Sequence, residues 1–181
     1  MKNAISVSAL SEFTHEVKLD SAEGMVKYGV ELDWQSGTRS RAKALSMEVG
    51  RHVVSRDFEW MIDEPRQILG TNQAPNPQEY LLSAIGSCIL VAFTIGASMM
   101  DIQLEQLKVT VRGDLNLAGF LAVDDHAPVG FSRVDYHIEV VGDATLEQFE
   151  VLRQRAIAHS PNAMTIMKSV DLQGQLVINK R

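Results

Sequence analysis

Hydrophobic residues in the first third of the chain follow a helical spacing and then a strand spacing. Within Ser6–Leu19, apolar residues recur every three or four positions, which is the pattern of an amphipathic helix. From Met25 to Trp34, apolar and polar residues alternate, which indicates a half-buried strand. Two further strands, Arg39–Met47 and Val53–Ile62, follow after short turns. Three strands joined in this way predict an antiparallel meander.

A long apolar helix is predicted after the loop at Asp63–Asn76, which is rich in Pro, Gly and Asn. Asn76 suits the N-cap and Pro77 suits the first helical position. Glu79 stands three residues after the cap, so a capping box is expected. The segment Tyr80–Met100 that follows has 21 residues and no charge.

The rest of the chain returns to strands and amphipathic helices. In order, we expect a strand through Leu107–Val111, an irregular excursion at Gly119–Gly130, a strand at Val134–Val141, a helix at Thr145–Ala158, a short helix from Ser160, and a closing strand at Leu172–Ile178. Strands separated from helices in this order indicate the α+β class. Neither a linker nor a repeat interrupts the pattern, so residues 1–181 are expected to form a single domain.

Composition narrows the class of protein. With 45% hydrophobic and 22% charged residues, the chain has the balance of a globular protein. A net charge of −6, with scattered Lys and Arg, argues against nucleic acid as a partner. One cysteine excludes an internal disulfide, and the first residues do not resemble a signal peptide, so we expect a cytoplasmic protein.

The uncharged segment Tyr80–Met100 is long enough to cross a bilayer. Its Ser, Gly, Thr and Ala content, its acidic flanks Glu79 and Asp101, and the lack of nearby Lys or Arg argue against a membrane span. A helix that is apolar on all sides can equally form the buried centre of a globular fold. We therefore expect a buried helix and no membrane.

Cys88 is the only plausible reactive group, although a lone cysteine on a buried helix is usually a small hydrophobic residue. It lies 12 residues past Asn76, beyond the reach of the positive end of the helix. A reactive thiolate at Cys88 therefore needs a cation from another element.

No metal or cofactor is expected. The five histidines show no metal-ligand spacing, and one cysteine cannot build a structural zinc site. The chain has no phosphate-binding loop, dinucleotide fingerprint or nucleophile elbow.

The segment Asn76–Cys88 resembles the central-helix signature of the OsmC/Ohr family, in which an Asn-Pro-capped helix carries a reactive cysteine. The order of motifs around it, from Asp63-Glu64-Pro65 to His159-Ser160-Pro161, continues the resemblance over about Val26–Val177. The resemblance implies the OsmC/Ohr-like fold, with antiparallel sheets around a long buried central helix. It also implies an intertwined homodimer with its sites at the dimer interface.

The resemblance further implies a thiol peroxidase. In the family, one cysteine attacks an organic hydroperoxide and becomes a sulfenic acid, and a second cysteine then closes a disulfide. An Arg from an N-terminal strand region and a Glu near the start of the central helix stabilise the thiolate. Here Cys88 matches the attacking cysteine, and either Arg39 or Arg41 matches the Arg, since strand alternation places both on one face. Two solvated arginines at a strand edge are the plain alternative.

This chain departs from the family pattern at two positions. Ser160 stands where the second cysteine is expected, and its sequence context suits a helix N-cap. Gln78 stands at the usual Glu position, ten residues before the cysteine, and the neighbouring Glu79 is better placed to cap the helix. Oxidised Cys88 would therefore need an external thiol reductant.

Three functions remain open. The leading hypothesis is a thiol-dependent redox protein that reduces organic hydroperoxides through Cys88. The second is a non-catalytic OsmC-like dimer that binds an apolar small molecule or a protein partner. The third is another enzyme with Cys88 as covalent nucleophile, for which no well-supported general base is present.

Overall fold

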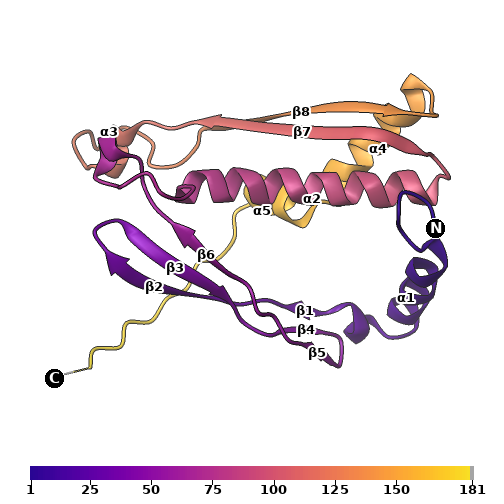
Figure 1. Ribbon diagram of the computed structural model, residues 1–181, viewed down its shortest axis with the longest axis horizontal. Coiled ribbons are helices and arrows are strands. Elements are labelled where there is room, and N and C mark those ends of the chain that lie inside the picture. The colour runs from indigo at the N-terminus through magenta and orange to yellow at the C-terminus, as the bar shows by residue number, and fades with distance from the viewer. Residues whose placement is uncertain (180–181) are drawn as a thin grey trace.

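The central helix α2 runs through the middle of the molecule, with two long strands on one side and an arm of short strands on the other (Figure 1). The computed structural model describes residues 1–179. The helices are α1 (Val7–Leu19), α2 (Pro77–Met99), α3 (Leu117–Phe120), α4 (Leu146–Ala158) and α5 (Pro161–Met167), with 3-10 turns η1 (Ser21–Gly24) and η2 (Arg66–Ile68). The strands are β1 (Val26–Lys27), β2 (Val30–Ser36), β3 (Arg39–Ala44), β4 (Met47–Val49), β5 (His52–Val54), β6 (Glu59–Ile62), β7 (Leu104–Asp114) and β8 (Arg133–Gly142). The α+β class is confirmed.

The predicted meander is confirmed, but each of its three strands is divided into two. The halves form two antiparallel sheets, in the orders β1-β4-β5 and β2-β3-β6. The division between β1 and β2 falls at Gly29, whose carbonyl accepts a hydrogen bond from the Leu45 amide at 3.0 Å. The Leu45 side chain lies directly over Gly29, where an added Cβ would stand 2.9 Å from Leu45 Cδ1. The arm therefore bends where one strand's side chain packs on another strand's backbone.

The start of α2 has the predicted capping box. The Asn76 side chain accepts from the Glu79 amide, and the Glu79 carboxylate accepts from the Asn76 amide, both at 2.8 Å. Pro77 occupies the first turn. The two reciprocal bonds satisfy amide groups that a helix start would otherwise leave without partners.

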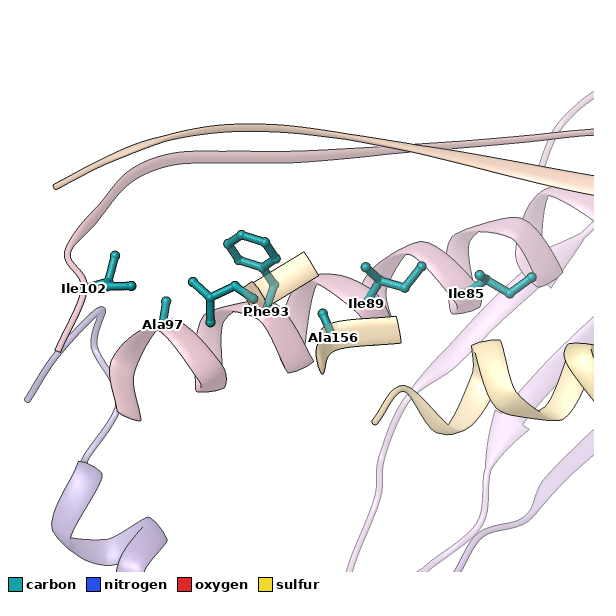
Figure 2. Packing of buried hydrophobic residues seen from close by; sticks show 7 residues of the cluster. Ile85, Ile89, Phe93, Ala97, Ile102 and Ala156 are labelled. Atoms are coloured by element: carbon teal, nitrogen blue, oxygen red, sulfur yellow. The ribbon is translucent and has the colours of Figure 1, made fainter. Parts of the chain in front are cut away.

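The core lies on one side of α2. Figure 2 shows Ile85, Ile89, Phe93 and Ala97 in a row along the helix, facing the strands and Ala156 of α4. The inward side chains of β7 and β8 pack on this row, and the two strands are antiparallel. This buried row explains the apolar sequence of the helix without a membrane.

By length and composition alone, α2 is long and apolar enough to cross a membrane, and it is the one such helix in residues 1–179. Its packing against α4 and β7 is that of a core helix in a globular fold. Not all of α2 is covered by this chain. Leu90 and Val91 are exposed on it, and Leu90 lines a hollow with Val109 and Val111 of β7.

The predicted closing strand at Leu172–Ile178 is wrong. Residues 168–179 form neither helix nor strand, and Leu172 is 97% exposed. A strand forms only when its amides pair with a second strand, and alternation in the sequence does not supply that partner. In Figure 1 the segment runs away from α5 toward the far end of the arm.

Candidate functional site

Cys88 lies at the middle of α2, at the edge of the buried side. Its thiol is free and its side chain is partly buried. Its neighbours Ile85 and Ile89 belong to the core, while Val91 on the next turn is exposed. The thiol is therefore neither fully enclosed in the core nor free on the surface.

Helix α5 packs beside the turn of α2 that leads to Cys88. Asn162 Nδ2 donates to the carbonyl of Ala84 at 2.8 Å, and Ala84 stands one helical turn before Cys88. Ser160 caps α5 by accepting from the Ala163 amide at 3.3 Å, and its side chain is 0% exposed. The position that carries the second cysteine in the family pattern therefore lies on the helix next to Cys88.

Neither candidate arginine contacts Cys88 through a hydrogen bond or ion pair within residues 1–179. Arg39 Nη1 donates to Gln73 Oε1 at 3.3 Å, and Arg39 lines a hollow of about 170 Å³ with Asp63. Arg41 is exposed and forms an ion pair with Asp33 at 3.5 Å. Arg39 is thus bound to the loop before α2, and Arg41 is bound to β2.

The other two candidates lie near the start of α2. Gln78 and Glu79 precede Cys88 by ten and nine residues, which is about 15 Å and about 14 Å along the helix axis. Glu79 holds the capping box, as expected from the sequence, and Gln78 lines a cavity at the helix start. Within residues 1–179 none of these four side chains forms a hydrogen bond or ion pair with Cys88, and their role stays a prediction.

Asp63 is a buried carboxylate whose role the sequence did not reveal. Its side chain is 1% exposed and accepts from Thr71 Oγ1 at 2.5 Å and from the amides of Glu64, Thr71 and Gln73. The Thr71 hydroxyl, with help from these amides, lowers the pKa of Asp63 to about 2. Asp63 thus holds the loop that leads into the cap of α2. Its only signal in the sequence is the Asp63-Glu64-Pro65 motif.

Glu64, the next residue, is not surrounded by hydrogen-bond donors as Asp63 is. Its Oε2 atom is buried and has no hydrogen-bond partner within the described residues. Burial raises the pKa of the Glu64 carboxyl. A hydrogen bond from the Asn76 side chain lowers this pKa, whereas the charges of Asp63 and Glu79 raise it. The loop around it is tightly closed, since an added Cβ on Gly70 would stand 1.6 Å from the Glu64 carbonyl oxygen.

Within residues 1–179, His, Cys, Asp and Glu side chains nowhere gather in a group of three or more that could hold a metal ion.

Comparison with known proteins identifies the family. The family model described as OsmC-like protein matches residues 70–173, which include α2, Cys88 and Ser160. No curated protein matches the chain in sequence.

Solved structures share the fold at low identity. An OsmC-like protein from Mycoplasma pneumoniae is 17% identical with a TM-score of 0.62, over 78% of this chain and 87% of that one. An OsmC-like protein of unknown function from Vibrio cholerae is 14% identical with a TM-score of 0.62, over 78% and 94%. An organic hydroperoxide resistance protein OsmC from Legionella pneumophila is 18% identical with a TM-score of 0.52, over 77% and 88%. The family match spans more than half of the 181 residues and these structures share the fold, so the chain belongs to the OsmC-like protein family.

Proposed function

We propose that this protein is a thiol-dependent redox protein that reduces organic hydroperoxides through Cys88. The observation that carries the proposal is a single free cysteine, partly exposed, at the middle of the central helix of an OsmC-like fold. A relative of similar fold, from Legionella pneumophila, bears the name organic hydroperoxide resistance protein.

The proposed cycle starts with attack of the Cys88 thiolate on the terminal oxygen of the hydroperoxide. The O–O bond breaks, the alkoxide takes up a proton and leaves as an alcohol, and Cys88 becomes a sulfenic acid. One external thiol then forms a mixed disulfide with Cys88 and releases water. A second external thiol attacks that disulfide and restores the Cys88 thiol.

An external thiol is required because residue 160 is a serine, and a hydroxyl cannot form a disulfide. Such thiols are abundant in a reducing cytoplasm, which is where we place the protein. This makes Cys88 a one-cysteine peroxidase centre in the proposal.

The proposal includes a homodimer with a site completed by the partner. The adjacent side chains Leu90 and Val91 of α2 are exposed, and a second α2 packed on this stretch would cover them. The cation beside Cys88 would then be Arg39 or Arg41 of the second copy, since within one chain Arg39 is bound to Gln73 and Arg41 to Asp33.

The test is a mass-spectrometric count of sulfenic acid on Cys88 in the presence of a sulfenic-acid trap. Small excesses of an alkyl hydroperoxide and of hydrogen peroxide are compared. We expect rapid labelling that favours the alkyl peroxide, and Cys88→Ser should abolish peroxide turnover while its circular dichroism stays that of the native protein. A thiol that stays unmodified, or full turnover in Cys88→Ser, would refute the proposal.

Restoring the second cysteine gives a separate prediction. In Ser160→Cys, peroxide should produce an internal disulfide with Cys88, because α5 packs on the turn of α2 before Cys88. Trap labelling should then disappear, and a dithiol should sustain turnover by reducing the internal disulfide. Loss of the Ser160 cap should cost about 1 kcal/mol of stability. Continued sulfenic-acid labelling without a disulfide would contradict the expected proximity.

A second candidate function is a non-catalytic dimer that binds an apolar small molecule or a protein partner. The serine at position 160 and the glutamine at position 78 favour it, because both replace groups on which the family chemistry depends. An inert Cys88, together with a thermal shift produced by an apolar ligand, would support this function over the first.

A further inference from the structure

Helix α5 lies beside the middle of α2, where Cys88 stands (Figure 1). It has 7 residues, too few for a helix that is stable by itself in water. Its place therefore depends on what it contacts. Ser160 and Ala163 at its start are buried, whereas Ile166 and Met167 at its end are 44% and 65% exposed. The first turn of α5 is thus the part that anchors it.

Asn162, in this first turn, supplies the polar link between α5 and α2. Its Nδ2 donates to the carbonyl of Ala84 at 2.8 Å. In residues 1–179 this is the one hydrogen bond that joins the two helices. The other side-chain bond within α5 itself runs from Thr165 to the carbonyl of Pro161. Removal of the Asn162 amide would therefore remove the polar link and leave the internal bonds of α5 in place.

The carbonyl of Ala84 belongs to the turn of α2 that carries the thiol. In a helix this carbonyl accepts the amide four residues later, which is that of Cys88. Ser87 Oγ also donates to it, at 3.2 Å. Helical side chains lean toward the N-terminus, so the Cys88 side chain leans toward the turn on which Asn162 donates. Residues four apart share one helix face, so α5 is docked on the face of α2 that holds the thiol.

This link is of a kind that opens readily. Asn162 is exposed, so water competes for its amide. A single hydrogen bond of this kind changes an equilibrium by a factor of about two to ten. Segments held by few contacts open locally at a lower free energy than the whole protein unfolds. A 7-residue helix with an exposed end and one polar link is such a segment.

We propose that Asn162 is a positioning residue for Cys88, because its bond to Ala84 keeps α5 docked beside the thiol and so limits the size of the reactants that reach the sulfur. With α5 docked, a slender alkyl hydroperoxide or a small thiol reaches Cys88. A bulky reactant reaches it only when α5 is displaced. The inference rests on the proposed function and assigns the reductant to the low-molecular-weight thiols, as opposed to a protein thiol.

The experiment measures the alkylation rate of Cys88 in the full chain, without peroxide. Two reagents with the same reacting group and different bulk are compared, N-ethylmaleimide and fluorescein maleimide. Asn162→Asp keeps the shape of the side chain and removes its donors, and Asn162→Ala removes the whole amide. Both variants should raise the rate with fluorescein maleimide by about two- to tenfold and change the rate with N-ethylmaleimide little, since the lost hydrogen bond is what keeps α5 docked.

The rates are recorded as a function of pH, because the thiolate is the reacting form. In Asn162→Ala the midpoint of the pH profile should equal that of the wild type, which separates a change of access from a change of the Cys88 pKa. The matched control is Thr165→Ala. Thr165 is also exposed on α5 and donates to a backbone carbonyl at 2.8 Å, but its bond stays within α5. This control should keep the wild-type ratio of the two rates.

Three results would overturn the proposal. The first is a wild-type ratio of the two rates in folded Asn162→Asp and Asn162→Ala. The second is an equal rise of the ratio in Thr165→Ala, and the third is a Cys88 that reacts with neither reagent in any variant. Failure of the peroxide assay is a separate result. A raised ratio in both Asn162 variants, together with no sulfenic acid after peroxide, would refute the peroxidase and leave the positioning role of Asn162 standing.

Discussion

At the residue scale, two adjacent carboxyl groups lie in opposite environments. Asp63 accepts hydrogen bonds from a hydroxyl and several amides, which lowers its pKa to about 2. Glu64 has a buried oxygen without a donor, and burial raises its pKa. The first carboxylate closes the loop before α2, and the second is enclosed beside Asn76 with one oxygen unbonded.

Asp63 predicts a dependence of stability on pH. Its pKa is lower in the folded state, about 2, than the ordinary 3.8, so its charge stabilises the fold above pH 3.8 and this stabilisation is lost as pH falls through 2. In urea unfolding, the wild type should lose stability between pH 4 and pH 2. Asp63→Asn should melt several degrees lower at pH 7 and lose less over the acidic interval.

Parallel pH profiles for the wild type and Asp63→Asn would contradict this account. An equal melting temperature at pH 7 would contradict it too. The control is Asp33→Asn, an exposed carboxylate on β2, whose loss should leave the acidic decline intact.

At the scale of elements, α2 is stabilised from one side by β7, β8 and α4. Phe93 and Phe149 stack with ring centroids 6.5 Å apart, and Leu152 reaches the backbone of α2 at Gly96. An added Cβ on Gly86 would stand 3.0 Å from Val111 Cγ2, so a small residue there keeps the helix close to β7. The position of Cys88 depends on this packing.

Two leucines of α4 provide a matched test of that packing. Leu152 is 1% exposed and Leu146 is 86% exposed. Leu152→Ala should lower the free energy of unfolding by about 2–5 kcal/mol, because it removes buried methyl groups and leaves a cavity. Leu146→Ala should change it by no more than about 0.5 kcal/mol. Equal effects in chemical denaturation would mean that α4 does not support α2 as described.

At the scale of the whole molecule, large apolar side chains are exposed on both the central helix and the arm. Leu90 and Val91 are exposed on α2, and on β2 the residues Val30, Leu32 and Trp34 are exposed on alternate positions of one face. Such surfaces are typical of an interface. They support the proposed homodimer, with partner contacts on both the helix and the arm.

The dimer is tested by sedimentation equilibrium. The mass should be about twice the 20.0 kDa of one chain. Val91→Glu, a change on the exposed side of α2, should shift the protein toward the single-chain mass, because it places a charge in the interface. Leu146→Glu, at an exposed site on α4, is the control. A single-chain mass for the wild type at micromolar concentrations would refute the homodimer.

Several elements were predictable because the signal lies in neighbouring residues. The capping box of Asn76 and Glu79 needs residues three apart, and the structure forms it as expected. The meander also follows from alternation and short turns, although its bend at Gly29 depends on Leu45, a residue distant in sequence. The family resemblance rests on the same local motifs around Cys88, and the family match confirms it.

What the sequence by itself determined is therefore the local pattern: helix starts, strand alternation, the α+β class and one candidate thiol. Only the tertiary structure decided which groups meet. It left Leu172–Ile178 without a partner strand and bound Arg39 to Gln73 and Arg41 to Asp33. It also buried Asp63 among donors and left one oxygen of Glu64 without a donor. The physical reason is the separation along the sequence of the residues that interact, because capping and alternation involve residues only a few positions apart. Strand pairing, burial and the partner of a charge depend on segments that only folding brings together.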